Sequence, residues 1–429
     1  MDASVSAKTT ANTFETDARA IVTAKYVRSA GTNDVVAGVQ PRFVVEPGSE
    51  QELAKLLKLA NAAGLAVIPR GAGTKLEWGN RPARADVILS TARLHRVIEH
   101  AWADLTVSAE AGCTIGKLQE ALAKHGQRLA LDALWPERAT VGGVLSTNDS
   151  GALRLRFGSL RDLVIGVTLA LADGTLASSG GRVVKNVAGY DLPKLATGAL
   201  GTLGVITRAF FRLHPLPQET RTISCATTDL RDAQRLALAI QNSKLAHSAL
   251  QIRCGAEMQP RVDVLFEGTE AGLTAQIEQV KAMIGAATIT DASGEVWNAR
   301  QEISSAGKNT VAEFAVAKFA TLPALIADTV DTIARLAAAE LRWSVVAQAT
   351  GIGWVRLEGK AQVIESTLRE FRVGLERSGG SLVIAHRPTG MAELDAWGNA
   401  GDVLPVMRAV KWQFDPDKTL NPGRFVGGI

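Results

Sequence analysis

A glycine-rich loop after a short apolar run is the stretch of this sequence best suited to bind an anion. The run Leu65–Ile68 ends at Pro69, and Arg70-Gly71-Ala72-Gly73-Thr74-Lys75 follows. Glycine accepts positive φ and has no side chain, so the main-chain N–H groups of such a loop can approach a phosphate closely. Arg70 and Lys75 add charge that suits an anion. The alternative is an ordinary turn, which the same residue types also mark.

The spacing of this loop excludes two common nucleotide motifs. A dinucleotide fingerprint of the Rossmann kind requires a third glycine at position 76, where the chain has Leu76. The phosphate loop of nucleotide hydrolases requires Gly-Lys-Ser/Thr after four free positions, and the sequence has no such run. We therefore expect the anion to be held by a different fold.

A second stretch, residues 140–151, is dense in small and hydroxyl residues. It predicts a short helix start followed by a turn, with many free backbone donors. A surface loop is the alternative, but the apolar flanks favour a loop that faces a ligand. Further on, glycines are frequent between two predicted strands, and because glycine destabilises element interiors we expect something large against this backbone. They are Gly174, Gly180, Gly181, Gly189, Gly198, Gly201 and Gly204.

The elements that must position these loops form a strand–helix–strand unit near the N-terminus. Phe43–Val45 is a predicted strand, and Ser49 opens a helix with Glu52 in capping-box spacing. The helix ends at Gly64, and the strand Leu65–Ile68 delivers the glycine loop. Residues 1 to about 40 show no clear periodicity and are expected to form a loose lead-in. Later predicted elements are strands at 87–89, 105–107, 164–171 and 205–213 and a helix at 117–124.

The character of the chain changes at His214–Pro217, where we place a domain boundary. From about 220 to 390 a helix–strand–strand pattern repeats, which is typical of an antiparallel sheet with helices on one face. The predicted elements are helices at 230–242, 322–338 and 363–376 and strands at 261–266, 344–347, 354–357 and 382–385. A short helix at 404–411 ends before Phe414-Asp415-Pro416. The expected domains are 1–217, 218–400 and a C-terminal return, 401–429.

Composition limits the classes of function. The chain has 429 residues, 46% of them hydrophobic, and 47 basic against 43 acidic residues give a net charge of only +4, which gives nucleic-acid binding little support. The three cysteines, Cys113, Cys225 and Cys254, form no Cys-x-x-Cys pair, so a thiolate-held zinc or iron–sulfur cluster is not expected. The unpaired cysteines, the polar N-terminus and the absence of long apolar runs predict a cytoplasmic protein.

Taken in order, the motifs resemble one family. Pro69–Thr74 is similar to the pyrophosphate loop of the FAD-binding family of vanillyl-alcohol oxidase and p-cresol methylhydroxylase, and Thr140–Gly143 to its second flavin loop. Gly201–Thr207 resembles the segment along the FAD, and Leu420–Arg424 the C-terminal return. Lys185–Asp191 and Arg424–Gly428 are similar to runs in the FAD-binding subunits of bacterial glycolate oxidases.

This resemblance implies an α+β fold: a two-subdomain FAD-binding domain followed by an antiparallel-sheet α+β cap domain. It also implies FAD as the cofactor. Because the family's flavin-linking histidine is replaced by Thr74, we expect the FAD to be bound noncovalently. The implied cofactor-binding residues are Pro69, Arg70, Gly71, Ala72, Gly73, Thr74, Thr140, Val141, Gly142, Gly143, Thr147, Gly151, Gly201, Gly204, Val205, Ile206 and Asn421.

No metal site is expected. Relatives that oxidise D-lactate or D-2-hydroxyglutarate carry His-x-Gly-Asp-Gly-Asn-x-His in the second domain, where the histidines belong to a metal site. Here the corresponding run is Gln348-Ala349-Thr350-Gly351-Ile352-Gly353-Trp354-Val355. Glutamine and valine do not replace imidazole as ligands of a transition-type metal.

Oxidation of a 2-hydroxy acid by flavin needs a cation for the carboxylate, a base for the hydroxyl proton and a fixed position for the Cα–H. The candidates are Lys185, His386, Arg387, Lys411 and Arg424, and among these His386, Arg387 and Arg424 are the predicted catalytic residues. Each has a structural alternative: a satisfied histidine for His386, a solvated strand end for Arg387 and a turn that pins the C-terminus for Arg424.

The resulting hypothesis is an FAD-binding subunit of a multi-subunit 2-hydroxy-acid (glycolate) dehydrogenase. A sister FAD subunit and an iron–sulfur subunit are the expected partners, because the chain lacks cysteine clusters for one-electron transfer. The complex could bring the chain to the inner face of the cell membrane. The alternatives are a self-sufficient FAD-dependent D-2-hydroxy-acid dehydrogenase and a structural subunit that binds no flavin.

Overall fold

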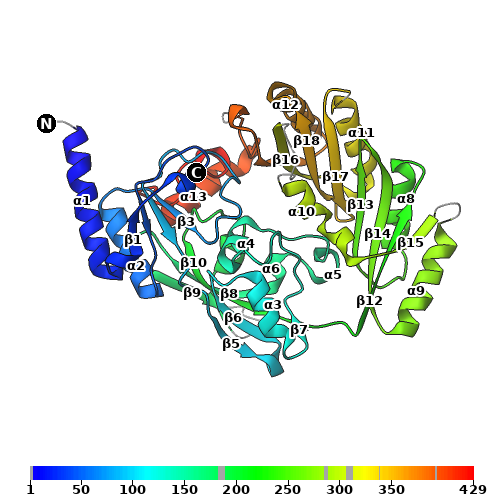
Figure 1. Cartoon of the computed structure of the whole chain (residues 1–429), viewed down its shortest axis with the longest axis horizontal. Coiled ribbons are helices and arrows are strands. Elements are labelled where there is room, and N and C mark those ends of the chain that lie inside the picture. The colour runs from blue at the N-terminus through cyan, green and yellow to red at the C-terminus, as the bar shows by residue number, and fades with distance from the viewer. Residues whose placement is uncertain (1–2, 182–188, 285–287, 306–312, 338, 392–393) are drawn as a thin grey trace. The chain divides into compact units, whose positions relative to one another are not determined.

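The computed structural model describes residues 3–181, 189–284, 288–305, 313–337, 339–391 and 394–429 (Figure 1). The chain divides into two compact units. The first comprises residues 1–149, 159–215 and 399–429, and the second comprises residues 150–158 and 216–398. Each unit is described by itself below.

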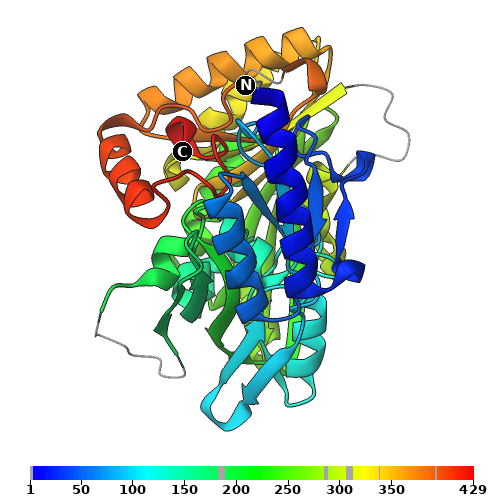
Figure 2. The same cartoon turned by 90° about the vertical axis from the view of Figure 1, so that its left-hand side faces the viewer.

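The N-terminus begins with a long helix, α1 (Ala3–Val22), which corrects the expected loose lead-in. Phe14, Ala18 and Val22 are buried, and α1 packs on α2 (Glu50–Ala62) (Figure 2). These three residues recur at a spacing of four, which is the helical signal that the sequence carried here. Three short 3-10 turns accompany the first unit's early elements, at Ala24–Tyr26, Thr32–Asp34 and Trp102–Asp104.

A four-stranded sheet delivers the glycine loop. Its order is β1 (Val27–Ser29), β2 (Phe43–Val45), β4 (Val87–Ser90), β3 (Val67–Arg70). β4 pairs in parallel with both β2 and β3, so the carboxyl ends of β3 and β4 lie at one edge of the sheet. The predicted cap of α2 is confirmed, because Ser49 Oγ accepts a hydrogen bond of 3.1 Å from the backbone N–H of Glu52.

The second layer of this unit is a five-stranded antiparallel sheet. Its order is β5 (Val97–Ala101), β6 (Thr106–Glu110), β10 (Val205–Arg212), β8 (Val164–Ala170), β9 (Leu176–Gly180). The remaining elements are α3 (Ile115–Ala123), β7 (Gln127–Arg128), α4 (Val141–Thr147), α6 (Leu160–Leu163), α7 (Leu192–Ala196), β11 (His214–Pro215), α13 (Leu404–Phe414) and a 3-10 turn at Val426–Gly428. α4 packs on β6 and β10.

The second unit is built on an eight-stranded antiparallel sheet. Its order is β15 (Thr288–Ala292), β12 (Glu219–Ala226), β14 (Met258–Gly268), β13 (His247–Gly255), β17 (Arg342–Gln348), β18 (Ile352–Gly359), β16 (Glu313–Ala320), β19 (Ser381–His386). The helices are α5 (Arg154–Phe157), α8 (Leu230–Gln241), α9 (Glu270–Met283), α10 (Ala299–Ser304), α11 (Ile326–Ala337) and α12 (Ala361–Arg377). Short 3-10 turns occur at Gly294–Asn298, Pro323–Leu325, Thr389–Met391 and, in the first unit, Gly401–Val403.

The two faces of this sheet differ. Val355 packs in one apolar core with Ile333 of α11 and Leu368 of α12, as the predicted one-sided helical layer requires. The neighbouring Arg356 points to the opposite face, where its Nη1 donates to the backbone oxygen of Ile303 in α10 at 3.0 Å. The expectation of helices on one face is therefore corrected, since α10 lies on the second, more polar face.

None of the helices within the described ranges combines the length and the apolar character needed to cross a membrane.

Candidate functional site

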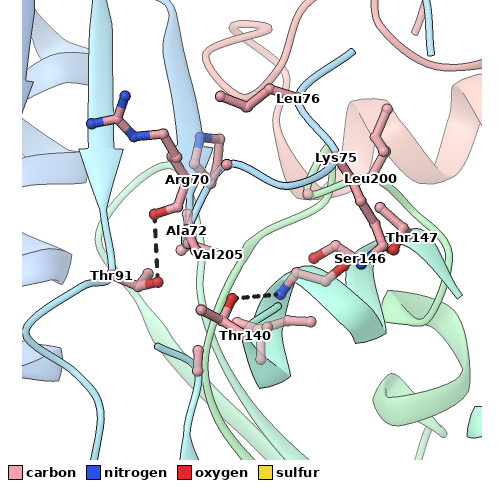
Figure 3. A pocket seen from close by; sticks show the side chains of 18 of the residues that line it. Arg70, Ala72, Lys75, Leu76, Thr91, Thr140, Ser146, Thr147, Leu200 and Val205 are labelled. Atoms are coloured by element: carbon pink, nitrogen blue, oxygen red, sulfur yellow. Dashed lines mark hydrogen bonds between the residues drawn. The ribbon is translucent and has the colours of Figure 1, made fainter. Parts of the chain in front are cut away.

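A cavity of ≈ 680 Å³, measured out to its open mouth, lies in the first unit at the ends of β3 and β4. The glycine loop, the start of α4, the segment before β10 and the C-terminal turn form its wall (Figure 3). Of the predicted cofactor residues, the following line it: Pro69, Arg70, Gly71, Ala72, Gly73, Thr74, Thr140, Gly142, Gly143, Thr147, Gly201, Gly204, Val205, Ile206 and Asn421.

Two of the predicted residues do not line the cavity. The side chain of Val141 is fully buried in the apolar core of the unit, and Gly151 lies in the segment 150–158 that belongs to the second unit. Lys75, which the sequence analysis named as a cation for the anion, and Arg424, a predicted catalytic residue, also line the cavity. The lining residues that the sequence reasoning missed are Leu76, Thr91, Ala111, Ser146 and Leu200. The sequence carried a signal for Thr91, because this residue directly follows β4, a strand parallel to β3. In the structure its N–H donates to Arg70 O at 2.8 Å.

The glycine loop offers unused main-chain donors to the cavity. Gly73 has φ +76°, a conformation that a side chain would strain. Within the described part of the chain, the N–H groups of Gly71, Ala72, Gly73 and Thr74 donate to no protein acceptor. Consecutive free N–H groups at a glycine turn form an anion-binding concavity.

The two predicted flavin loops meet at this cavity and leave no room for larger side chains. A Cβ at Gly71 would lie 2.1 Å from Thr140 Oγ1, and a Cβ at Gly142 would lie 2.9 Å from the Cβ of Ala111. Both distances are far below ordinary van der Waals contact. The absence of side chains at these positions therefore sets the shape of the cavity.

The start of α4 differs from expectation. Thr140 Oγ1 caps the helix by accepting from Gly143 N at 3.3 Å (Figure 3). The N–H groups of Val141 and Gly142 donate to Cys113 O and Ala111 O, each at 2.8 Å. The expectation of many free donors in this stretch is therefore corrected, and the free donors come from the 71–74 loop.

The two cations of the glycine loop line the cavity, and each is also paired with a protein carboxylate. Arg70 Nη1 lies 2.7 Å from Asp34 Oδ1, and Lys75 Nζ lies 3.1 Å from Asp149 Oδ2. Figure 3 shows the guanidinium of Arg70 directed away from Thr140. A hydrogen bond from Arg28, assisted by one from Arg70, holds the pKa of Asp34 well below its usual value against the opposing effect of burial.

The C-terminal segment closes the cavity. Asn421 Nδ2 donates to Leu200 O at 2.6 Å, and Arg424 Nη2 donates to Leu76 O at 2.5 Å and Trp78 O at 2.7 Å. Burial lowers the pKa of Arg424 to about 10, so the guanidinium remains charged at neutral pH. These contacts fit the alternative in which Arg424 pins the C-terminal turn.

Lys411, another candidate cation, also supports this segment. Its Nζ donates to Thr202 O at 2.7 Å, to Leu420 O at 3.0 Å and to Asp415 Oδ2 at 2.5 Å. Burial lowers the pKa of Lys411, and the carboxylate of Asp415 opposes that shift. Lys411 therefore joins α13 to the loop before β10.

Two of the glycines between β8 and β10, Gly174 and Gly180, are required by the protein's own packing. A Cβ at Gly180 would lie 2.1 Å from Ile165 O, and one at Gly174 would lie 2.7 Å from Ala54 O. Of the seven glycines, only Gly201 and Gly204 line the cavity. The expectation that a large ligand explains the whole glycine run is corrected accordingly.

The remaining catalytic candidates lie elsewhere. His386, at the end of β19, stacks on Phe314 with ring centroids 4.3 Å apart. Arg387 Nη1 donates to the backbone oxygen of Leu394. Both residues belong to the second unit, and Lys185 lies outside the described residues.

On the second face of the eight-stranded sheet, the structure shows a cluster that the sequence reasoning missed. Arg300 of α10 and Lys318 of β16 lie 5.8 Å and 5.9 Å from the ring centroid of the buried Trp354. Gln348 is 3% exposed, and its Oε1 has no hydrogen-bond partner in the described part of the chain. Lys318 pairs with Trp354 across β16 and β18, and the sequence reasoning predicted no strand at β16.

The first-unit cavity fits FAD in two respects. Four consecutive free amides suit a diphosphate, and positions without a Cβ admit it closely. Asn421 Oδ1 is also buried at the cavity without a partner in the described ranges, so a polar ligand edge can satisfy it.

Comparisons with known proteins agree with this geometry. Residues 41–180 match the FAD binding domain family. The chain is 31% identical over 283 residues to mitochondrial D-lactate dehydrogenase (cytochrome) of Arabidopsis thaliana, covering 61% of this chain and 50% of that protein. It is 28% identical over 240 residues to glycolate oxidase subunit GlcD of Bacillus subtilis, covering 56% of this chain and 50% of the relative. The chain thus spans about half the length of these curated relatives.

Solved structures share the fold at low identity. p-Cresol methylhydroxylase with substrate bound superposes with a TM-score of 0.76 at 14% identity, covering 96% of each chain. Alkyldihydroxyacetonephosphate synthase gives 0.74 at 17% identity, covering 96% of this chain and 84% of that one. The predicted α+β fold class is confirmed. Residues 41–180 thus match the FAD binding domain family, which makes FAD the cofactor, and the chain shares the fold of p-cresol methylhydroxylase.

Proposed function

We propose that this chain is an FAD-dependent oxidoreductase acting on the CH–OH group of a 2-hydroxy acid, and that it works as the FAD-binding subunit of a multi-subunit glycolate dehydrogenase. The observation that carries the cofactor side of the proposal is the set of four free amides at the glycine loop. The substrate class is supported by the names of the relatives, which include D-lactate dehydrogenase, D-2-hydroxyglutarate dehydrogenase and a glycolate oxidase subunit.

Bound FAD would accept the two electrons, so the protein has to bind the 2-hydroxy acid and take up its hydroxyl proton. Arg300 and Lys318 are the best-supported carboxylate ligands, because two cations gathered around one buried indole suit an anion of small size. Gln348 adds a buried amide whose Oε1 can accept a hydrogen bond from a hydroxyl group.

His386 is the proposed base for the hydroxyl proton. It is half-buried and held flat against Phe314, and a neutral imidazole can accept a proton near neutral pH. Arg387 is retained as a further carboxylate ligand, although its Nη1 already donates to Leu394 O. Arg424 is proposed to stabilise the wall of the FAD cavity, because its Nη2 donates to the backbone oxygens of Leu76 and Trp78.

The proposed partners are a sister FAD subunit and an iron–sulfur subunit. The chain has only three cysteines, all buried and distant in sequence, so one-electron transfer needs another chain. α13 supports an assembly because it exposes Val406 and Trp412, at 65% and 66%, next to the exposed Val403 of the preceding 3-10 turn. We propose that the chain is cytoplasmic and that the other subunits of the complex attach it to the inner face of the cell membrane.

Steady-state kinetics with glycolate and D-lactate and an artificial electron acceptor test the substrate site. Lys318→Met is expected to raise KM by about 10- to 100-fold, since a charge-assisted contact is worth about 1.5–3 kcal/mol. The exposed Lys244→Met is the matched control and should leave KM unchanged. An unchanged KM in Lys318→Met would remove this cluster from the substrate site.

Purification from native cells separates the subunit proposal from its two alternatives. Co-elution of a second flavoprotein and an iron–sulfur protein supports the subunit. Full glycolate or lactate dehydrogenase activity of the chain alone would support a self-sufficient enzyme. A colourless chain that takes up no FAD would support a structural subunit.

A further inference from the structure

We propose that His100 and His125 form a binding site for a divalent transition-metal ion, with copper(II) preferred over nickel(II) and zinc(II). Both residues belong to the first unit, and neither lines the FAD cavity. The site is therefore separate from the proposed oxidation of a 2-hydroxy acid. The expectation of no metal site rested on residues 348–355 of the second unit and did not consider this pair.

The fold brings the two histidines together from different elements. His100 lies in β5 and is half-buried, and His125 follows α3 and is exposed. Their ring centroids are 5.1 Å apart, and the ring planes make an angle of 89°. An ion bound at about 2.0–2.1 Å by one nitrogen of each ring places the centroids roughly 5–6 Å apart. The observed separation therefore suits one ion shared by the two rings.

Gln127 determines which nitrogen of His100 is available to the ion. Gln127 is 7% exposed, and its Nε2 donates to the backbone oxygen of Trp102 at 2.7 Å. This bond sets the orientation of the amide, because a carbonyl oxygen only accepts. Gln127 Oε1 then lies 2.9 Å from His100 Nε2, so Nε2 carries the proton and donates. The lone pair of the neutral ring is therefore on Nδ1, and a hydrogen bond from the other nitrogen is the usual support of a metal-bound histidine.

His125 can supply the second nitrogen without loss of a protein hydrogen bond. Its imidazole forms no hydrogen bond within the described part of the chain. One face of the ring stacks on Trp102, with centroids 5.7 Å apart and planes at 11°. Stacking occupies the face of the ring, whereas a metal ion binds a nitrogen at its edge. The contact with Trp102 thus orients His125 and leaves its nitrogens accessible.

The number and type of ligands favour copper(II). In the described ranges, no group of three or more His, Cys, Asp or Glu side chains is arranged to hold a metal, so water completes the coordination. Structural zinc sites take four protein ligands, whereas copper(II) forms the strongest complexes among the divalent first-row ions. The two histidines therefore form an exchangeable site and not a structural one.

The test is titration of the full chain, prepared without an affinity tag, with copper(II) chloride, followed by isothermal titration calorimetry and tryptophan fluorescence. His100→Asn and His125→Asn should each weaken binding by about 10-fold or more, because each removes one of two ligands. His95→Asn alters an exposed histidine outside the pair and should behave as the wild type. Bound copper(II) should quench Trp102, so Trp102→Phe should lose this quenching and still show binding by calorimetry.

Gln127 is a positioning residue, and its variants test the assigned tautomer. Gln127→Met should weaken copper(II) binding by about 10-fold, because loss of such a hydrogen bond typically costs about 10- to 100-fold in metal affinity. Gln127→Glu keeps an acceptor for His100 Nε2 and should stay within about 3-fold of the wild type, with circular dichroism confirming the fold of both variants. Wild-type affinity in folded His100→Asn or His125→Asn, or tighter binding of zinc(II) than of copper(II), would overturn the proposal. Equal affinities of Gln127→Met and the wild type would overturn the role of Gln127.

Discussion

At the scale of single residues, the cavity depends on the contact between Gly71 and Thr140. The two positions lie 69 residues apart in the chain, yet a single added Cβ would lie 2.1 Å from the threonine hydroxyl. Thr140 Oγ1 is also the cap of α4, so it cannot rotate away without exposing Gly143 N. Glycine at 71 is therefore required for space, while glycine at 73 is required for its positive φ.

We predict that Gly71→Val abolishes flavin retention, because the side chain separates the two loops that enclose the ligand. The measurement is the ratio of flavin to protein absorbance after purification. Gly374→Ala is the matched control, since a Cβ there meets nothing within 4 Å and the position lies inside α12. It should retain flavin and gain stability of about 1 kcal/mol. A yellow Gly71→Val protein would contradict the prediction.

The ion pairs of Asp34 also predict a dependence on pH. Because hydrogen bonds from Arg28 and Arg70 depress the pKa of Asp34 in the folded protein, its contribution is present above its unfolded pKa, about 3.9, and is lost as pH falls below that value. The melting temperature should thus depend little on this residue between about pH 5 and 8. Below about pH 4 it should fall more steeply in the wild type than in Asp34→Asn. Parallel curves for the two proteins would be the contrary result.

At the scale of elements, the C-terminal segment stabilises the wall of the cavity through hydrogen bonds. Lys411 of α13 is bound to the oxygens of Thr202 and Leu420 and to Asp415. Asp415 in turn accepts from the N–H groups of Thr419 and Leu420 at 2.9 and 2.7 Å. One buried ion pair therefore fixes both the loop before β10 and the turn that carries Asn421.

We predict that Asp415→Asn destabilises the first unit by about 3–5 kcal/mol, because it leaves the Lys411 ammonium buried without its counter-ion. Differential scanning calorimetry should show a drop in Tm of roughly 5–15 °C. The control is the exposed Asp402→Asn, for which little change is expected. An equal decrease in Tm for Asp415→Asn and Asp402→Asn would contradict a stabilising role of the Lys411–Asp415 ion pair.

At the scale of the whole molecule, α13 shows a face that the chain itself leaves exposed. Only Lys411 of its eleven residues is buried, while Val406 and Trp412 are largely exposed. A helix with apolar residues on both its inner and outer sides is typical of burial from two directions. This is the surface on which we expect a partner subunit.

We predict that Trp412→Glu prevents co-purification of partner subunits without loss of flavin, because the charge would have to be buried in an apolar interface. Native-cell pull-down followed by mass spectrometry measures the first effect, and the visible spectrum measures the second. Leu322→Glu alters a similarly exposed apolar residue of the second unit and should leave partner binding intact. An unchanged set of co-purifying chains in Trp412→Glu would exclude this face.

The sequence by itself determined the local elements and the residues that need glycine. The cap at Ser49, the strand before the glycine loop and the helix at Thr140 follow from residue type and spacing over a few positions. The repeated helix–strand pattern likewise predicted the antiparallel sheet of the second half. These features depend on interactions between near neighbours, which a sequence displays directly.

Tertiary structure decided which charges are available. Arg70 and Lys75 were expected to face an anion, and they line the cavity, but the sequence did not show that Asp34 and Asp149, 36 and 74 positions away in the chain, pair with them. The cluster of Arg300, Lys318 and Trp354 is likewise assembled from one helix and two strands. Pairing across such distances depends on how the sheets pack, so residue spacing carried no sign of it.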